Sequence, residues 1–335
     1  MSLTNQAPTM NNRKTYTHLS QSDIALQIES LVQGIEESDT PAFRITQSCS
    51  GYERVEETRL SRYFTHIKQM IDLFDDRVEC SYSEHLQAFR DACQDVGLER
   101  AANGPVCLNE RGTAFLDHHN SMNVLTARIR QLTRELWYRR KSGDRRGEAR
   151  KQEIRVCNYF DAVNELYSRI TIVRVDFHYR SEAQARLRVE NVFDDLDELI
   201  AEHKRNHIFD HLIGHIYAVE QGDRNDGGGY HIHAAYFFNG NEVCRDIWKA
   251  QKIGALWEDI THGRGYIHSC NHDKDRYGDE CGVGRIQRDD YAIRRHVHKA
   301  VKYLVKDAQH LRLRPVGARC LRMGRLRQSC RRCCR

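Results

Sequence analysis

The chain has 335 residues and a net charge of +5, with 40% hydrophobic residues, 30% charged residues and only 4 Pro. This composition excludes a collagen-like or low-complexity chain and is typical of a folded, polar protein with one large domain or two ordinary ones. The apolar runs are far shorter than the roughly 18 residues of a membrane-spanning helix, and no apolar secretory signal follows the start. We therefore expect a cytoplasmic protein with no membrane partner, in which most of the 12 Cys are reduced thiols.

Residues 1–19 are polar and aperiodic, which predicts a disordered lead-in. Over 20–167 apolar residues recur at spacings of three and four, which predicts an all-helical N-terminal region. Within it, the basic run 139–155 contains a Ser-Gly-Asp sequence and predicts a surface turn or linker between two charged helix ends. No catalytic constellation is recognisable in this half of the chain.

After residue 168 the apolar period changes to that of strands, rich in β-branched and aromatic residues. Strands are predicted at 169–179, 212–221, 230–239 and 266–270. Helices are predicted at 183–208, 242–257 and 290–311. A glycine-rich linker between the second and third strands is typical of a hairpin. The order strand–helix–strand–strand–helix–strand is the split βαβ plan and predicts an α+β domain, an antiparallel sheet with helices on one face, over 168–324.

The sharpest chemical feature is His231-Ile232-His233 on the third predicted strand. Alternation along a strand places both imidazoles on one face, so two nitrogen ligands converge. Two histidines on a solvent-facing strand would give the same pattern. Glu220 ends the preceding strand, and the hairpin returns the chain beside it, so a carboxylate can complete a divalent metal site with open positions. Glu220 could equally be an exposed residue at a strand end.

The last predicted helix contains Tyr303 and Lys306, which lie one helical turn apart and share a face with Lys299. A phenol is a weak nucleophile at neutral pH, so it needs a metal that polarises its target or a nearby cation. The His-x-His pair can supply the first and Lys306 the second. By itself Tyr-x-x-Lys is a weak motif, because amphipathic helices often carry a half-buried Tyr beside a Lys.

The C-terminal part of the chain is basic. From residue 308 onward there are nine Arg and no Lys, Asp or Glu. The net charge of this part is therefore +9, and that of the rest of the chain is −4. Such an arm is typical of contact with phosphate backbones, and a merely solvated tail is the alternative. The last segment, 325–335, is a Cys- and Arg-rich tail with a Cys-x-x-Cys spacing. A zinc site would need a second ligand pair, and none stands nearby.

Taken in this order, the motifs resemble those of the HUH endonucleases, which are named for a His-hydrophobic-His pair. The chain is most similar to the rolling-circle replication initiators of filamentous phages (inoviruses) and their prophage relatives of the YagK/YfjJ type. The stretches that carry the resemblance are 229–233, 300–306 and 311–315, and the similarity covers roughly 168–324.

The resemblance implies a ferredoxin- or RRM-like HUH sheet that holds Mg²⁺ or Mn²⁺ on His231, His233 and Glu220. Tyr303 would attack the scissile phosphate of single-stranded origin DNA, giving a 5′-phosphotyrosyl link and a free 3′-OH that starts rolling-circle replication, while Lys306 positions the phosphate. A host helicase and polymerase are further partners that this reading suggests. The expected DNA contacts are Arg312, Arg314, Arg319, Tyr230 and Lys299.

Two other functions remain open. One is a non-catalytic DNA-binding or regulatory prophage protein that keeps the fold and the charge. The other is a relaxase or transposase that uses the same chemistry. The sequence contains one Tyr in the motif, so a joining step would need another nucleophile or a second subunit.

Overall fold

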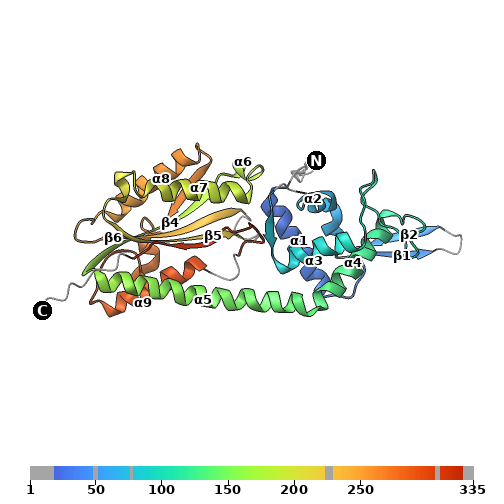
Figure 1. Ribbon diagram of the computed structural model, residues 1–335, viewed down its shortest axis with the longest axis horizontal. Coiled ribbons are helices and arrows are strands. Elements are labelled where there is room, and N and C mark those ends of the chain that lie inside the picture. The colour runs from blue at the N-terminus through green and yellow to red at the C-terminus, as the bar shows by residue number, and fades with distance from the viewer. Residues whose placement is uncertain (1–18, 48–51, 76–77, 223–228, 306–309, 327–335) are drawn as a thin grey trace, which may run out of the picture.

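A computed structural model describes residues 19–47, 52–75, 78–222, 229–305 and 310–326. The protein is α+β: a mainly helical N-terminal region precedes a mostly antiparallel sheet with interspersed helices. Figure 1 shows the helical region and the sheet side by side, with one long helix running beneath both. The lead-in 1–19, apart from its last residue, and the tail 325–335, apart from its first two residues, lie outside the described residues.

The N-terminal region is built on helices that bury apolar stripes against one another. Its first helix begins at a capping box, in which the Ser20 hydroxyl accepts from the Asp23 N–H and the Asp23 carboxylate accepts from the Ser20 N–H. The helices of this region are α1 (Gln21–Glu36), the 3-10 helix η1 (Ser61–His66), α2 (Ile67–Asp72), α3 (Glu84–Asp95) and α4 (His118–Arg134).

The expectation that this region is all-helical is wrong in two places. Strands β1 (Phe43–Gln47) and β2 (Glu53–Glu57) form an antiparallel hairpin, and β3 (Cys80–Tyr82) pairs with β9 (Leu313–Pro315) from the far end of the chain. Both segments alternate polar and apolar residues over only a few positions, a signal too short to stand out among helical stripes.

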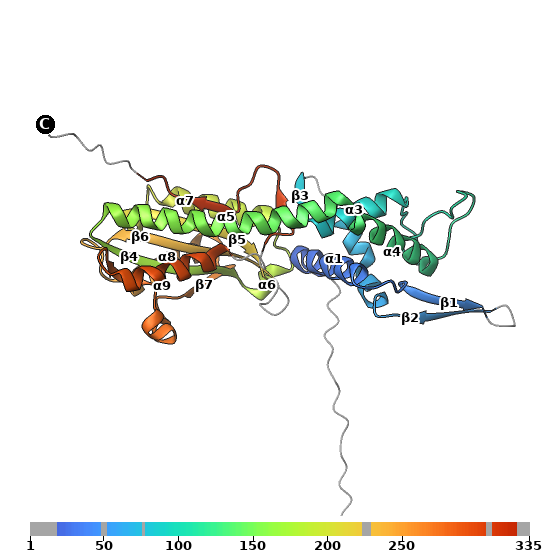
Figure 2. The same cartoon turned by 90° about the horizontal axis from the view of Figure 1, so that it is seen from below.

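The predicted linker at 139–155 is also wrong, because these residues belong to one 31-residue helix, α5 (Leu136–Leu166). A glycine inside a helix costs only about 1 kcal/mol relative to Ala, and the flanking Lys, Arg and Glu residues are good helix formers. In Figure 2 the helix extends from the helical region along the whole sheet. Its last turns bury Val156, Phe160 and Val163 against the sheet.

The central sheet has the strand order β10-β5-β6-β4-β7, and β8 pairs with the other half of β4. All of these pairings are antiparallel. The antiparallel sheet expected from the sequence is therefore confirmed, but its strands β8 and β10 were not predicted. The strands are β4 (Arg169–Tyr179), β5 (Leu212–Gln221), β6 (Tyr230–Asn239), β7 (Gly265–Ser269), β8 (Gly284–Gln287) and β10 (Leu321–Met323).

Helices cover both faces of the sheet, although the sequence predicted them on one face only. One face packs on α7 (Val189–Glu202) and α8 (Asp246–Ile260), and the other on α5 and α9 (Tyr291–Lys302). The last predicted helix is shorter than expected, since α9 ends at Lys302 and a 3-10 turn, η4 (Tyr303–Val305), follows. The remaining short helices are α6 (Ser181–Gln184), η2 (His207–Phe209) and η3 (Lys274–Glu280).

The helical region and the sheet share buried polar contacts, so residue 167 is not a clean boundary between them. Arg312 Nε donates to Glu29 Oε2 of α1 at 2.9 Å, and Gln221 Nε2 donates to the Ser22 carbonyl at 2.9 Å. Together with the β3–β9 pair, these contacts tie the start of the chain to its end. Within the described part, no helix combines the length and apolar character that crossing a bilayer requires.

Candidate metal and nucleophile site

One face of the sheet is divided into an apolar half and a polar half. On β6 the residues that point toward α5 and α9 are Phe237, Ala235, His233 and His231. The first two are buried among apolar side chains of α5 and α9, and the two histidines continue the same face beyond that cover. The sequence therefore places the imidazoles correctly on one face, because side chains alternate along a strand.

The strand register brings partners from both neighbouring strands to these histidines. In one cross-strand row Glu220 of β5 lies opposite His231. In the next row His233 lies between Ala218 of β5 and Asp176 of β4. Directly opposite residues on one face are close enough for their side chains to interact, so the register assembles the site without any loop rearrangement.

Glu220, His231 and His233 form one compact, buried group. Glu220 Oε2 lies 3.3 Å from His233 Nε2 and 4.0 Å from His231 Nε2. One ligand atom from each residue lies within 4.8 Å of the others. All three side chains are buried, so the reading of Glu220 as an exposed strand-end residue is excluded. Two imidazoles and a carboxylate suit a divalent ion, and these residues can hold one.

Asp176 orients one of the metal-ligand candidates. His233 Nδ1 donates to Asp176 Oδ1 at 2.6 Å, which leaves Nε2 directed at the Glu220 carboxylate. Ligating histidines in metal sites commonly use the second ring nitrogen in this way. The sequence indicated that Asp176 and His178 could help to bind the ion or DNA, but neither was among the predicted site residues. The sequence pattern could have identified Asp176, because the polar residues Arg174, Asp176 and His178 occupy every second position of a strand that is otherwise mostly apolar.

Burial and charge move the pKa values of these groups in opposite directions. Burial, and then the adjacent His233, lower the pKa of His231 to about 3, so His231 is a neutral ligand. Burial opposes the charge on His233, but Asp176 and Glu220 outweigh it and raise the pKa of His233 to about 10. A proton therefore occupies His233 in the metal-free protein, and a bound cation would take its place between the carboxylates.

Tyr303 lies beside this group. Its ring centroid is 5.9 Å from that of His233, and the Arg174 guanidinium stacks over the ring at 4.5 Å. Arg174 is buried, and its Nη2 lies 3.8 Å from Asp176 Oδ1. Tyr303 is 40% exposed, so a macromolecular substrate can reach it. Asp176 and Arg174 thus link the phenol to the histidine group through two adjacent side chains of β4.

In a second group, Asp176, His268 and Cys270, one ligand atom from each residue again lies within 4.8 Å of the others. His268 Nδ1 lies 3.8 Å from Asp176 Oδ2, and its Nε2 is 2.9 Å from Asp273 Oδ2. The Arg174 cation and the bond to His233 already occupy Asp176, so the first group is the better metal site.

The remaining predicted residues fall into four classes. Lys306 lies outside the described residues. Lys299 is exposed on α9 and pairs with Glu280. Arg314 and Arg319 line a pocket beside Glu220.

The prediction that Arg312 and Tyr230 contact DNA is wrong, because both side chains are almost fully buried. The Arg312 guanidinium is committed to Glu29 and to the carbonyls of Gln221 and His310. The Tyr230 hydroxyl donates to Gln21 Oε1 at 3.0 Å. Their side chains hold the helical region against the sheet.

A search against models of protein families, curated proteins and solved structures found no match to the chain.

Proposed function

We propose that the protein is a metal-dependent endonuclease of the HUH type that nicks single-stranded DNA through Tyr303. The observation that carries the proposal is the position of an accessible phenol beside a buried His-His-Glu group. These residues come from β5, β6 and the 3-10 turn η4 that follows α9, and they meet on one face of the sheet. Few other reactions need a tyrosine next to three such ligands with open coordination positions.

The arrangement of the sheet supports this proposal. The order β5-β6-β4-β7, with helices between β4 and β5 and between β6 and β7, is the order of a ferredoxin- or RRM-like split βαβ domain. The His pair lies on a central strand of that sheet, and the tyrosine follows a later helix, as the resemblance to HUH endonucleases implies.

A divalent ion on Glu220, His231 and His233 would polarise the scissile phosphate. The protein's own residues supply the rest of the step. The Tyr303 hydroxyl loses its proton as its oxygen attacks phosphorus, the bond from phosphorus to the 3′-oxygen breaks, and the leaving 3′-oxygen takes up one proton, so the proton count is unchanged. The products are a 5′-phosphotyrosyl link and a free 3′-OH. Arg174 holds the ring in position, and Asp176 keeps His233 in the tautomer that ligates.

We further propose that the free 3′-OH primes rolling-circle replication of a filamentous phage or prophage. This assignment rests on the resemblance of the motifs. Tyr291 is an unsuitable second nucleophile, since it begins α9 and lies twelve positions before Tyr303, about 18 Å along a helix. A second subunit or another nucleophile would therefore complete the joining step.

The test uses a random-sequence pool of single-stranded DNA, Mn²⁺ and the full-length chain, with products separated under denaturing conditions. We expect an adduct that retains a label at the 3′ end of the DNA and releases a label at the 5′ end. Tyr303→Phe should abolish the adduct, and Tyr291→Phe, a matched change at the start of the preceding helix α9, should not. Binding without an adduct under every divalent ion would instead support the non-catalytic DNA-binding function.

A further inference from the structure

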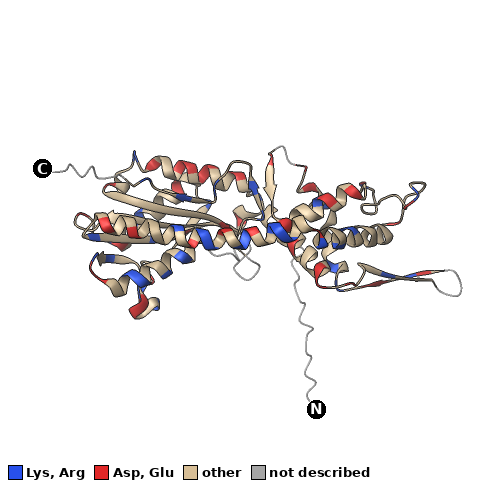
Figure 3. Ribbon diagram, turned by 60° about the horizontal axis from the view of Figure 1, so that its bottom comes forward, with Lys and Arg blue, Asp and Glu red and all other residues tan. Residues whose placement is uncertain are grey.

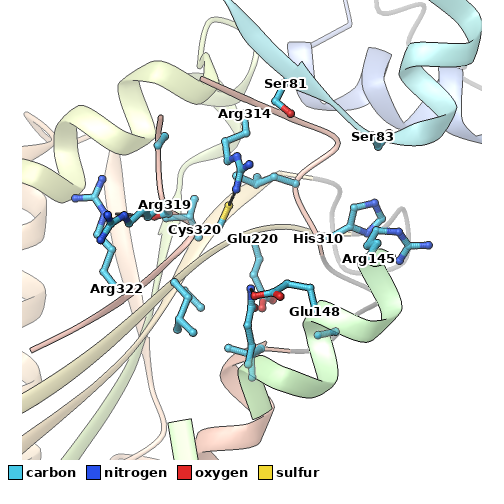
Figure 4. Close-up of a pocket in the computed structure, with 18 of the residues that line it drawn as sticks. Ser81, Ser83, Arg145, Glu148, Glu220, His310, Arg314, Arg319, Cys320 and Arg322 are labelled. Carbon is cyan, nitrogen blue, oxygen red and sulfur yellow. Dashed lines mark hydrogen bonds between the residues drawn. The ribbon is translucent and has the colours of Figure 1, made fainter. Parts of the chain in front are cut away.

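A pocket of about 1100 Å³ opens beside the candidate metal site. Its walls are the middle of α5, the segment from β9 to β10, and the loop between β3 and α3. Glu220 forms part of its lining, so the pocket reaches the metal-ligand group from the side of the sheet on which β10 and β5 lie. Figure 4 shows Arg145 and Glu148 of α5 on one side and Arg314 and Arg319 on the other, with Glu220 between them. We call this space the α5 groove.

Cations lie on both walls of the α5 groove. Arg145 and Arg155 come from α5, and Figure 3 shows that Lys and Arg recur along this helix. Arg314 and Arg319 come from the C-terminal segment.

Two of the acidic lining residues are already paired with arginines. Glu84 accepts from Arg145 Nε at 3.1 Å, and Asp197 pairs with Arg322. Asp144, Glu148 and Glu220 also line the groove, but Arg155 of α5 and Arg319 of the C-terminal segment are exposed, so an anionic chain between the walls would find a guanidinium group on each side.

We infer that the α5 groove binds the nucleotides of a single DNA strand next to the scissile phosphate. The inference rests on the proposed function, because only that function places a phosphate at Glu220. The volume of about 1100 Å³ lies just above the usual range of small-ligand pockets, about 300 to 1,000 Å³, so it accommodates a few unstacked nucleotides and not a duplex. Tyr82 and the guanidinium planes offer surfaces on which bases can stack.

This inference gives the helical N-terminal region a role. It supplies α5 and the β3–α3 loop, and with them one whole wall of the groove, while the sheet domain supplies the other. Single-strand binding would then depend on the contacts that hold the two regions together.

The experiment measures the affinity of the full-length chain for a fluorescent oligo(dT) strand of about 12 nucleotides, within the usual site sizes of single-strand binders. EDTA prevents cleavage. The groove variants are Arg155→Gln and Arg319→Gln, one on each wall. Their matched controls are Arg150→Gln, on the same helix, and Arg205→Gln, in the turn after α7 of the sheet domain, both exposed and outside the groove lining.

Each groove variant should lose one phosphate contact. The negative slope of log K against log salt should then become shallower by about 0.7, and the affinity at 0.15 M salt should fall about fourfold. The double variant should lose about fifteenfold, because the two contacts are separate. The controls should bind like the wild type, and a duplex of equal length should compete weakly. Groove variants that bind like their controls, or a duplex that competes as well as the single strand, would overturn the inference.

The outcome is separable from that of the proposed function. If the wild type forms no adduct with Mn²⁺ but the groove variants lose affinity, the nuclease proposal fails and the groove stands as a single-strand binding site. If the adduct forms, Arg155→Gln and Arg319→Gln should raise the DNA concentration for half-maximal rate and leave the saturated rate unchanged. If both variants form the adduct with the wild-type DNA concentration for half-maximal rate, the groove inference fails and the nuclease proposal stands.

Discussion

Arg312→Gln should destabilise the protein. It should reduce DNA binding only to the extent that it reduces the folded fraction. Arg312 is 4% exposed and lies between the helical region and the sheet. Its Nε donates to Glu29 Oε2 at 2.9 Å, and its Nη1 donates to the carbonyls of Gln221 and His310 at 2.8 and 2.9 Å. The substitution removes the cation and leaves the buried Glu29 carboxylate without it.

Removing one partner of a buried ion pair typically costs about 3–5 kcal/mol, because the remaining charge stays desolvated. We expect a loss in that range for Arg312→Gln. Arg312→Met combined with Glu29→Leu removes both charges and should recover more than half of the loss. The recovery should be incomplete, because two buried carbonyls still lack their donor.

The assay is urea unfolding at pH 7.5, with single-strand affinity measured on the same samples below the unfolding transition. Arg325→Gln, an exposed change nearby, should stay within about 0.5 kcal/mol of the wild type. A loss of less than about 1 kcal/mol for Arg312→Gln would refute the reasoning from burial. So would wild-type stability combined with a loss of DNA affinity, since Arg312 would then act as the DNA contact that the sequence suggested.

Three further predictions concern the site and the core. Asp176→Asn should lower Mn²⁺ affinity about 10- to 100-fold in a titration, because His233 loses the partner that orients it; unchanged affinity would contradict that role. Arg174→Gln should slow adduct formation while Mn²⁺ affinity stays largely intact, because its guanidinium holds Tyr303; an unaltered rate would contradict this. Burial lowers the pKa of His203 to about 3 and that of His215 to about 4. Each should therefore remove about 1.4 kcal/mol of stability per pH unit as the pH falls from 6.5 toward 4, where only the unfolded chain takes up the proton. In melting curves, the stability of His203→Gln should decline less steeply with falling pH than that of the wild type. An equal slope would contradict the lowered pKa of His203.

Much of the sheet domain could be predicted from local periodicity. The strand at 169–179 has the predicted bounds, and His231 and His233 share a face because side chains alternate along any strand. The hairpin between β5 and β6 could be predicted from its glycine-rich linker, and it sets Glu220 opposite His231. These features depend on residues close together in the chain, so the order of amino acids alone determines them.

The tertiary structure decided the rest, because it depends on contacts between distant segments. Asp176 and His233 are 57 positions apart, and only the register of β4 against β6 makes them partners. The burial of Arg312 depends on α1, 283 positions away. The continuity of α5 is favoured by the burial of both its ends, since Tyr138 packs in the core of the helical region and Phe160 packs beneath the sheet. These tertiary contacts outweigh the weak helix propensity of Ser, Gly and Asp between them. Charge and aromatic character indicate what a side chain can bind, but its neighbours in space determine whether it is exposed to bind it.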